Sequence, residues 1–137
     1  GFMGSPQMNF LDAVVRINGT AVTLEVAGQS IPLPPAKAKK LIDGGYNGKT
    51  VTMGIRPEDV SSRPIVQEVY PDANVDAEVV VSELLGAETM LYSRVGNTEF
   101  VSRVDARDYH KPGEKVRLTF NLNKAHFFND ETDQSIV

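Results

Sequence analysis

The sequence predicts an all-β domain, an antiparallel barrel or sandwich of the small kind that includes the OB fold. Three observations support this class. Apolar and polar residues alternate along much of the chain, short strand-like runs recur at intervals of about ten residues, and turn-forming residues separate them. Helix content should be low, since only one stretch has helical character.

Two hairpins anchor the strand assignment. Residues 13–17 alternate, Asn18-Gly19 follows, and residues 22–26 alternate again. Asn-Gly between alternating runs is a strong signal for a tight hairpin turn. The second hairpin joins residues 89–95 to residues 98–104 through Gly96-Asn97. Further strands are expected at residues 51–55, 79–85 and 116–122, and the last of these is apolar at every even position.

One short helix is expected near residues 35–43. Pro34-Pro35 precedes it and Gly44-Gly45 follows it, which is the usual placement of proline at the start and glycine at the end. The turn-rich segment at residues 61–75 is where we expect a division between two interlaced lobes.

Composition and charge narrow the function. The 137 residues fit one domain, and an apolar fraction of 41% can build its core. The chain has no cysteine, which excludes disulfides and thiolate metal sites. The net charge is −4, made up of +1 in residues 1–70 and −5 in residues 71–137. Nucleic-acid binding is not expected without a concentrated basic patch.

No catalytic, cofactor-binding or metal-binding residue is predicted. Gly44 to Thr50 ends in Gly-Lys-Thr as a P-loop does, but Asp43 stands where the first P-loop glycine belongs. This segment also runs from a helix into a strand, the reverse of a P-loop, so an ordinary helix end is expected. His110 and His126 have no partners at metal-site spacing, so neither is assigned a ligand or catalytic role.

The candidate functional residues are therefore interface residues. Pro57 fixes the backbone and aims Arg56 and Glu58, which form either a local ion pair or an intermolecular contact. The apolar segments at both ends of the chain pose a similar choice between core and interface. The residues predicted for the interface are Met8, Asn9, Phe10, Leu11, Arg56, Glu58, Phe127 and Phe128. Residues 8–11 should be packed as a strand or lid.

Four segments resemble one family, in the family's order. They are Phe2 to Leu11, Gly54-Ile55-Arg56-Pro57-Glu58, Glu83 to Thr89, and Lys124-Ala125-His126-Phe127-Phe128. Together they are similar to the C-terminal regulatory domain of ATP-binding subunits in bacterial carbohydrate importers, the MalK-like ABC transporters. We therefore expect residues 1–137 to be this domain of a longer subunit, with its ATPase domain outside the sequence.

The resemblance implies an OB-like barrel of the TOBE or MOP kind and a role in regulation and dimerisation. It implies no catalysis here, because the Walker A, signature and Walker B motifs are absent, and ATP and Mg²⁺ would bind in the ATPase domain. The implied partners are a second copy, the attached ATPase domain, membrane permease subunits and a regulatory protein. The implied location is the cytoplasmic face of the bacterial membrane.

One alternative from the same resemblance stays open. Related domains in other importers bind oxyanions, so a module that binds an oxyanion or a sugar phosphate is the second function considered.

Overall fold

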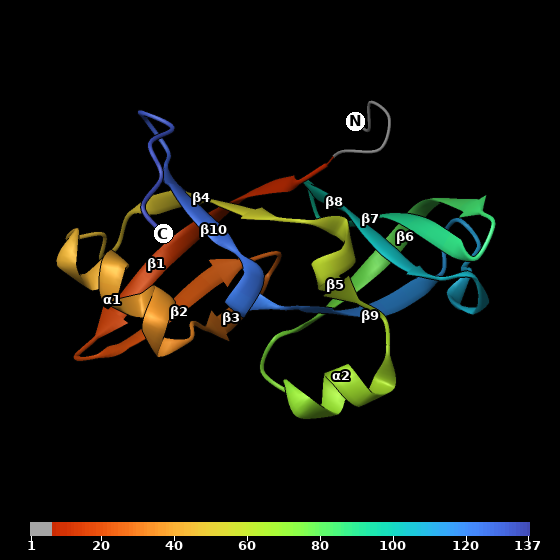
Figure 1. Ribbon diagram of the computed structural model, residues 1–137, viewed down its shortest axis with the longest axis horizontal. Coiled ribbons are helices and arrows are strands. Elements are labelled where there is room, and N and C mark those ends of the chain that lie inside the picture. The colour runs from red at the N-terminus through yellow and green to blue at the C-terminus, as the bar shows by residue number, and fades with distance from the viewer. Residues whose placement is uncertain (1–6) are drawn as a thin grey trace.

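The structure is a computed structural model that describes residues 7–137, and it consists of two five-stranded antiparallel sheets joined end to end (Figure 1). The first sheet has the order β10-β4-β1-β2-β3. Its strands are β1 (Asn9–Asn18), β2 (Ala21–Val26), β3 (Gln29–Pro32), β4 (Thr50–Ile55) and β10 (His126–Asn129). The second sheet has the order β5-β9-β6-β7-β8. Its strands are β5 (Val60–Ser61), β6 (Asn74–Leu85), β7 (Glu88–Val95), β8 (Thr98–Asp105) and β9 (Lys115–Phe120).

The chain visits the first sheet twice. It builds β1 to β4, crosses into the second sheet through the 3₁₀ turn η1 (Pro57–Asp59), and returns as β10. In Figure 1 the blue β10 lies beside the yellow β4, although the whole second sheet separates them in sequence. Buried residues of both sheets form one continuous core that includes Leu11, Met53, Leu118 and Phe127. The fold is the antiparallel, mostly β architecture that the sequence predicts.

Both hairpins are confirmed in register. Strands β1 and β2 pair from Val14↔Glu25 to Asn18↔Ala21 around the Asn18-Gly19 turn. Strands β7 and β8 pair from Glu88↔Asp105 to Val95↔Thr98 around Gly96-Asn97. Gly19, in the turn of the first hairpin, has a φ of +66°, a left-handed backbone that glycine adopts without steric cost.

The first helix, α1 (Pro35–Asp43), has the predicted bounds and a well-defined end. The Gly45 amide donates to the Ile42 carbonyl and the Tyr46 amide donates to the Leu41 carbonyl, and Gly45 has φ +71. This is the Schellman arrangement that closes a helix at glycine. The segment that resembles a P-loop is therefore a helix end followed by a loop into β4.

A second helix, α2 (Pro64–Val69), was not predicted. It lies inside the turn-rich segment, contains no buried residue and is only six residues long, too short for apolar periodicity to reveal it. Pro64 at its first turn and the extended Arg63 before it were the available signals. The short strands β3, β5 and β10 and the 3₁₀ turns η2 (Ala106–Asp108) and η3 (Leu122–Lys124) were also missed.

Candidate functional site

The beginning of β1 fastens the first sheet to the second. Asn9 is 5% exposed, and its side chain lies against the outer strand β8. Its Nδ2 donates to the Val101 carbonyl at 2.8 Å, and its Oδ1 accepts from the Val101 amide at 2.7 Å. One side chain thus satisfies both backbone groups of a buried residue, as a neighbouring strand would.

An aromatic patch lies next to this junction on the outer surface of the first sheet. We define it as Met8, Phe10, Gly54 and Phe128. Phe10 is 63% exposed, and its ring meets that of Phe128 edge-on, with 6.1 Å between centroids. A Cβ on Gly54 would lie 2.6 Å from the Met8 Sδ and 3.0 Å from the Phe128 Cε2. The glycine therefore lets both side chains pack directly over β4.

The segment after β4 turns as its sequence predicts. Arg56 is extended, with φ −73 and ψ 151, and Pro57 begins η1. Both Arg56 and Glu58 are exposed. The local ion pair considered between them does not form, and neither has any ion pair with another residue in the range 7–137. Their side chains are free to make other contacts.

The eight predicted interface residues divide by exposure. Phe10, Arg56 and Glu58 are exposed, and Met8 and Phe128 are half-buried. Asn9, Leu11 and Phe127 are at most 5% exposed, so their assignment to a surface is corrected here. They hold the fold together, because their strand positions point inward. Residues 9–11 lie in β1 as expected, but Phe10 points outward and Met8 precedes the strand; Phe2 to Pro6 lie outside the described residues.

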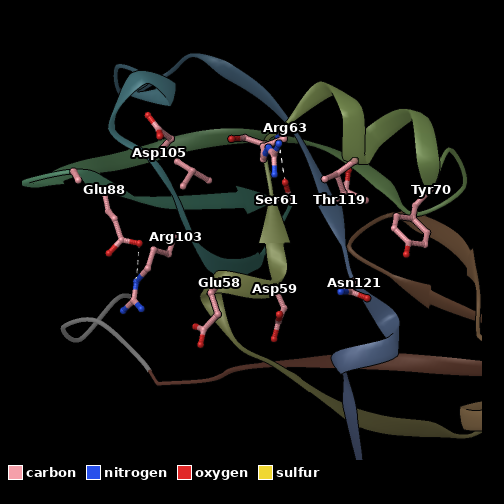
Figure 2. Close-up of a pocket in the computed structure, with 14 residues that line it drawn as sticks. Glu58, Asp59, Ser61, Arg63, Tyr70, Glu88, Arg103, Asp105, Thr119 and Asn121 are labelled. Atoms are coloured by element: carbon pink, nitrogen blue, oxygen red, sulfur yellow. Dashed lines mark hydrogen bonds and ion pairs between the residues drawn. The ribbon is translucent and has the colours of Figure 1, made fainter.

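A cavity of about 480 Å³ opens between β5 and β8, the two outer strands of the second sheet. Figure 2 shows η1 and β5 on one side, β7 and β8 on the other, and α2 at the edge. Its lining contains the carboxylates of Glu58, Asp59, Glu88 and Asp105 and the guanidinium groups of Arg63 and Arg103. The cavity is therefore polar and carries both signs of charge.

Two polar groups at the cavity, the Asp59 carboxyl and the Asn121 side-chain oxygen, lack a hydrogen-bond partner in the part of the chain that the structure describes. Burial raises the pKa of the Asp59 carboxyl, and the charge of Glu58 raises it further. The Asn121 Oδ1 is shielded from solvent and has no hydrogen-bond partner within residues 7–137. Sequence reasoning missed this cavity, since its lining comes from segments between Glu58 and Asn121 that no local pattern links.

The two histidines belong to different segments of the fold. His110 Nδ1 lies 2.7 Å from the Asp108 carbonyl oxygen, and His126 begins β10. The described residues contain no group of three or more His, Cys, Asp or Glu side chains placed to hold a metal ion. In the same part of the chain, no helix is long and apolar enough to cross a membrane.

Comparison with protein families decides the classification. The TOBE domain model matches residues 53–128, more than half of the chain. The chain belongs to the TOBE domain family. The model of the MalK OB fold domain matches residues 4–60 of this TOBE protein, largely N-terminal to the TOBE match. The resemblance found in the four sequence motifs is thereby confirmed.

Individual relatives of this TOBE domain are ATP-binding proteins. It is 56% identical over 136 residues to the multiple sugar-binding transport ATP-binding protein MsmK of Streptococcus mutans, covering 99% of this chain and 35% of that protein. It is 40% identical over 141 residues to the oligosaccharides import ATP-binding protein MsmX of Bacillus subtilis, and the match covers 99% of this chain and 36% of that protein. It is 36% identical over 137 residues to the trehalose/maltose import ATP-binding protein MalK of Thermococcus litoralis, and the match covers 99% of this chain and 36% of that protein. The chain thus spans about a third of these relatives.

The fold also has a solved counterpart. The cytoplasmic molybdate-binding protein ModG, with molybdate bound, matches with a TM-score of 0.60 and 13% identity, covering 91% of this chain and 96% of that one. At this identity the likeness concerns the fold alone. It supports the OB-like, MOP-like class of the TOBE domain.

Proposed function

We propose that this TOBE domain is the regulatory and dimerisation part of the ATP-binding subunit of a bacterial ABC importer for carbohydrates. The observation that supports this most strongly is the 56% identity to MsmK along 99% of the chain. ATP and Mg²⁺ bind and react in the part of the subunit that lies outside these residues. The domain itself carries out no catalysis.

The assembly follows from this role. The domain connects to its own ATPase domain, pairs with a second copy, and offers a docking surface for a regulatory protein. Through the ATPase domain, the subunit works with the permease at the cytoplasmic face of the membrane. The surface proposed for pairing is the aromatic patch, because Phe10 exposes 63% of its surface on a sheet face, and a two-fold contact would bring two such patches together.

The alternative function, binding of an oxyanion or a sugar phosphate, gains no support from the cavity. Four carboxylates line it against two guanidinium groups, which is unfavourable for an anion. The likeness to ModG concerns the fold, and no residue argument transfers molybdate binding to this chain.

Domain replacement in an intact importer tests the proposal. The matching third of MsmK is replaced by residues 1–137, and sugar uptake is measured in a Streptococcus mutans strain that lacks its own MsmK. We expect the chimera to restore uptake. The same chimera with Phe127→Ala should fail, because that side chain is completely buried in the core. A chimera that is present at normal level and hydrolyses ATP but supports no uptake would contradict the proposal.

A further inference from the structure

We propose that the cavity between β5 and β8 binds an uncharged polyhydroxyl compound of the size of a mono- or disaccharide. The proposal goes beyond the function above, since it requires neither pairing of domains nor an attached ATPase. The volume of about 480 Å³ lies within the range of small-ligand pockets, about 300–1,000 Å³.

The lining combines hydrogen-bond donors with acceptors. Arg63 and Arg103 supply guanidinium donors, whereas Asp59 and Glu88 supply carboxylate acceptors. The Ser62 and Thr119 hydroxyls are already used, since they donate to Asp108 and Asn74. The Tyr70 hydroxyl can donate or accept, and the Ser61 hydroxyl, which accepts from the Arg63 amide, can still donate to a ligand. Each hydroxyl of a polyol both donates and accepts, so such a ligand can meet a lining of mixed character at every position.

One acceptor in the lining is available to a ligand. The half-buried Asp59 carboxyl makes no side-chain hydrogen bond to another residue in the range 7–137, and burial raises its pKa. The backbone of Asp59 is held in place, because its carbonyl accepts from the Asn121 amide at 2.9 Å. A partly buried acceptor of this kind is stabilised by an incoming O–H donor.

The charges of the cavity disfavour anionic ligands. An anion would approach Glu58, Asp59, Glu88 and Asp105, which line the same open pocket. Guanidinium groups are fewer there: Arg63 forms no ion pair with a described residue, and the Arg103 Nε lies 3.9 Å from Glu88. A neutral ligand meets no such repulsion and still uses the charged groups as strong hydrogen-bond partners.

Apolar surface completes the site. Val66 of α2 and Val104 of β8 line the cavity together with Tyr70, which follows α2 and is 41% exposed. Pyranose rings present C–H faces as well as hydroxyls, and apolar and aromatic surface accommodates these faces. Figure 2 shows Tyr70 on the α2 side of the residues that line the cavity.

Titration of the 137-residue chain followed by ¹H–¹⁵N NMR tests the proposal. The probes are glucose and maltose as neutral sugars, glucose 6-phosphate and molybdate as anions, and arginine as a cation. We expect glucose or maltose to cause saturable shifts at the amides of Asp59, Ser61, Arg103 and Asn121, with a Kd of about 1 mM or tighter. The anionic probes should cause no saturable shift there, and arginine should bind less tightly than the sugars.

Two variants locate the site. Asp59→Asn should weaken sugar binding by about tenfold, because a charged acceptor is replaced. Arg63→Gln, an exposed position before α2, should weaken it similarly without loss of fold. Asp12→Asn, the same change on an exposed position of β1, should leave binding unaltered. The proposal is overturned if neither neutral sugar saturates these amides, if a charged probe binds more tightly, or if both cavity variants bind like the parent chain.

Discussion

Asn9 and Val101 form a two-pronged hydrogen-bonded junction between the sheets, with distances of 2.8 and 2.7 Å, across 92 residues of sequence. Asn9 is the first residue of β1, and Val101 lies in the middle of the outer strand β8. Val101 is itself 1% exposed, so solvent cannot replace the asparagine. The junction therefore holds β1 at its very first residue.

Replacing Asn9 with alanine should lower the free energy of unfolding by about 2–4 kcal/mol, since it leaves a buried amide and a buried carbonyl without partners. Chemical denaturation measures this loss, and hydrogen exchange should show the Val101 amide losing protection. Asn123→Ala, at an exposed position of η3, is the control and should change stability by less than about 0.5 kcal/mol. Equal effects of the two changes would refute a special role for the junction.

Phe127 and Phe128 should contribute very differently to the free energy of unfolding. Phe127 is 0% exposed, so Phe127→Ala should cost about 3–5 kcal/mol of unfolding free energy. Phe128 is half-buried in the aromatic patch, where an edge-on aromatic pair contributes about 0.5–1.5 kcal/mol. Phe128→Ala should therefore cost markedly less than Phe127→Ala. Thermal and urea unfolding of both variants measure the two losses of unfolding free energy. A larger loss for Phe128→Ala than for Phe127→Ala would contradict the register of β10.

Gly54 should resist substitution because of what lies over it. Gly54→Ala brings a Cβ against Met8 and Phe128, and overpacking of this kind costs about 1–3 kcal/mol. In a Met8→Ala background the nearest clash is removed, so the same substitution should cost less. The double-mutant cycle measures this coupling. Additive losses would show that Met8 does not rest on Gly54.

Asp59 and Asp76 should affect the pH dependence of stability in opposite directions. Burial raises the pKa of Asp59 above its ordinary 3.8, so the folded state binds this proton more tightly than the unfolded state. Its contribution to stability is present below the unfolded pKa and is lost as pH rises through the folded pKa. Asp59→Asn should accordingly raise Tm at pH 7, and the gain should shrink below about pH 4.

Asp76 shows the reverse behaviour. The hydrogen bond from Arg117 lowers the pKa of its carboxyl, with 2.8 Å between the Arg117 Nε and the Asp76 Oδ1. The resulting stability is present above the unfolded pKa and is lost as pH falls through the folded pKa. Asp76→Asn should lower Tm slightly at pH 7, because the pair is exposed, and this loss should vanish in acid. Calorimetry over a pH series checks both aspartates, and equal signs at pH 7 would contradict the assignment.

Local patterns were sufficient for the elements that carry strong turn chemistry. Asn18-Gly19, Gly96-Asn97 and Gly44-Gly45 each end an element where the sequence predicts, since few residues accept the required backbone. Helix α2 was missed because it is only six residues long, fewer than two helical turns, so an apolar stripe has no room to repeat.

The candidate site depended on long-range geometry that periodicity does not encode. Phe127 and Phe128 look equivalent in sequence, yet strand alternation puts one in the core and the other on the patch. The cavity gathers residues from Glu58 to Asn121, and only the approach of β5 to β8 brings them together. The partner of Asn9 was equally unpredictable, because Val101 is an ordinary apolar strand residue.

Light scattering over a wide range of protein concentration tests pairing through the aromatic patch most directly. The 137-residue chain should pass from the mass of one copy towards that of two, and Phe10→Ser should stay at one copy. Val69→Ser, a change of similar character at a 61% exposed position of α2, should associate like the parent chain. A parent chain that remains a monomer at the highest concentration, or a Phe10→Ser variant that still pairs, would contradict the account.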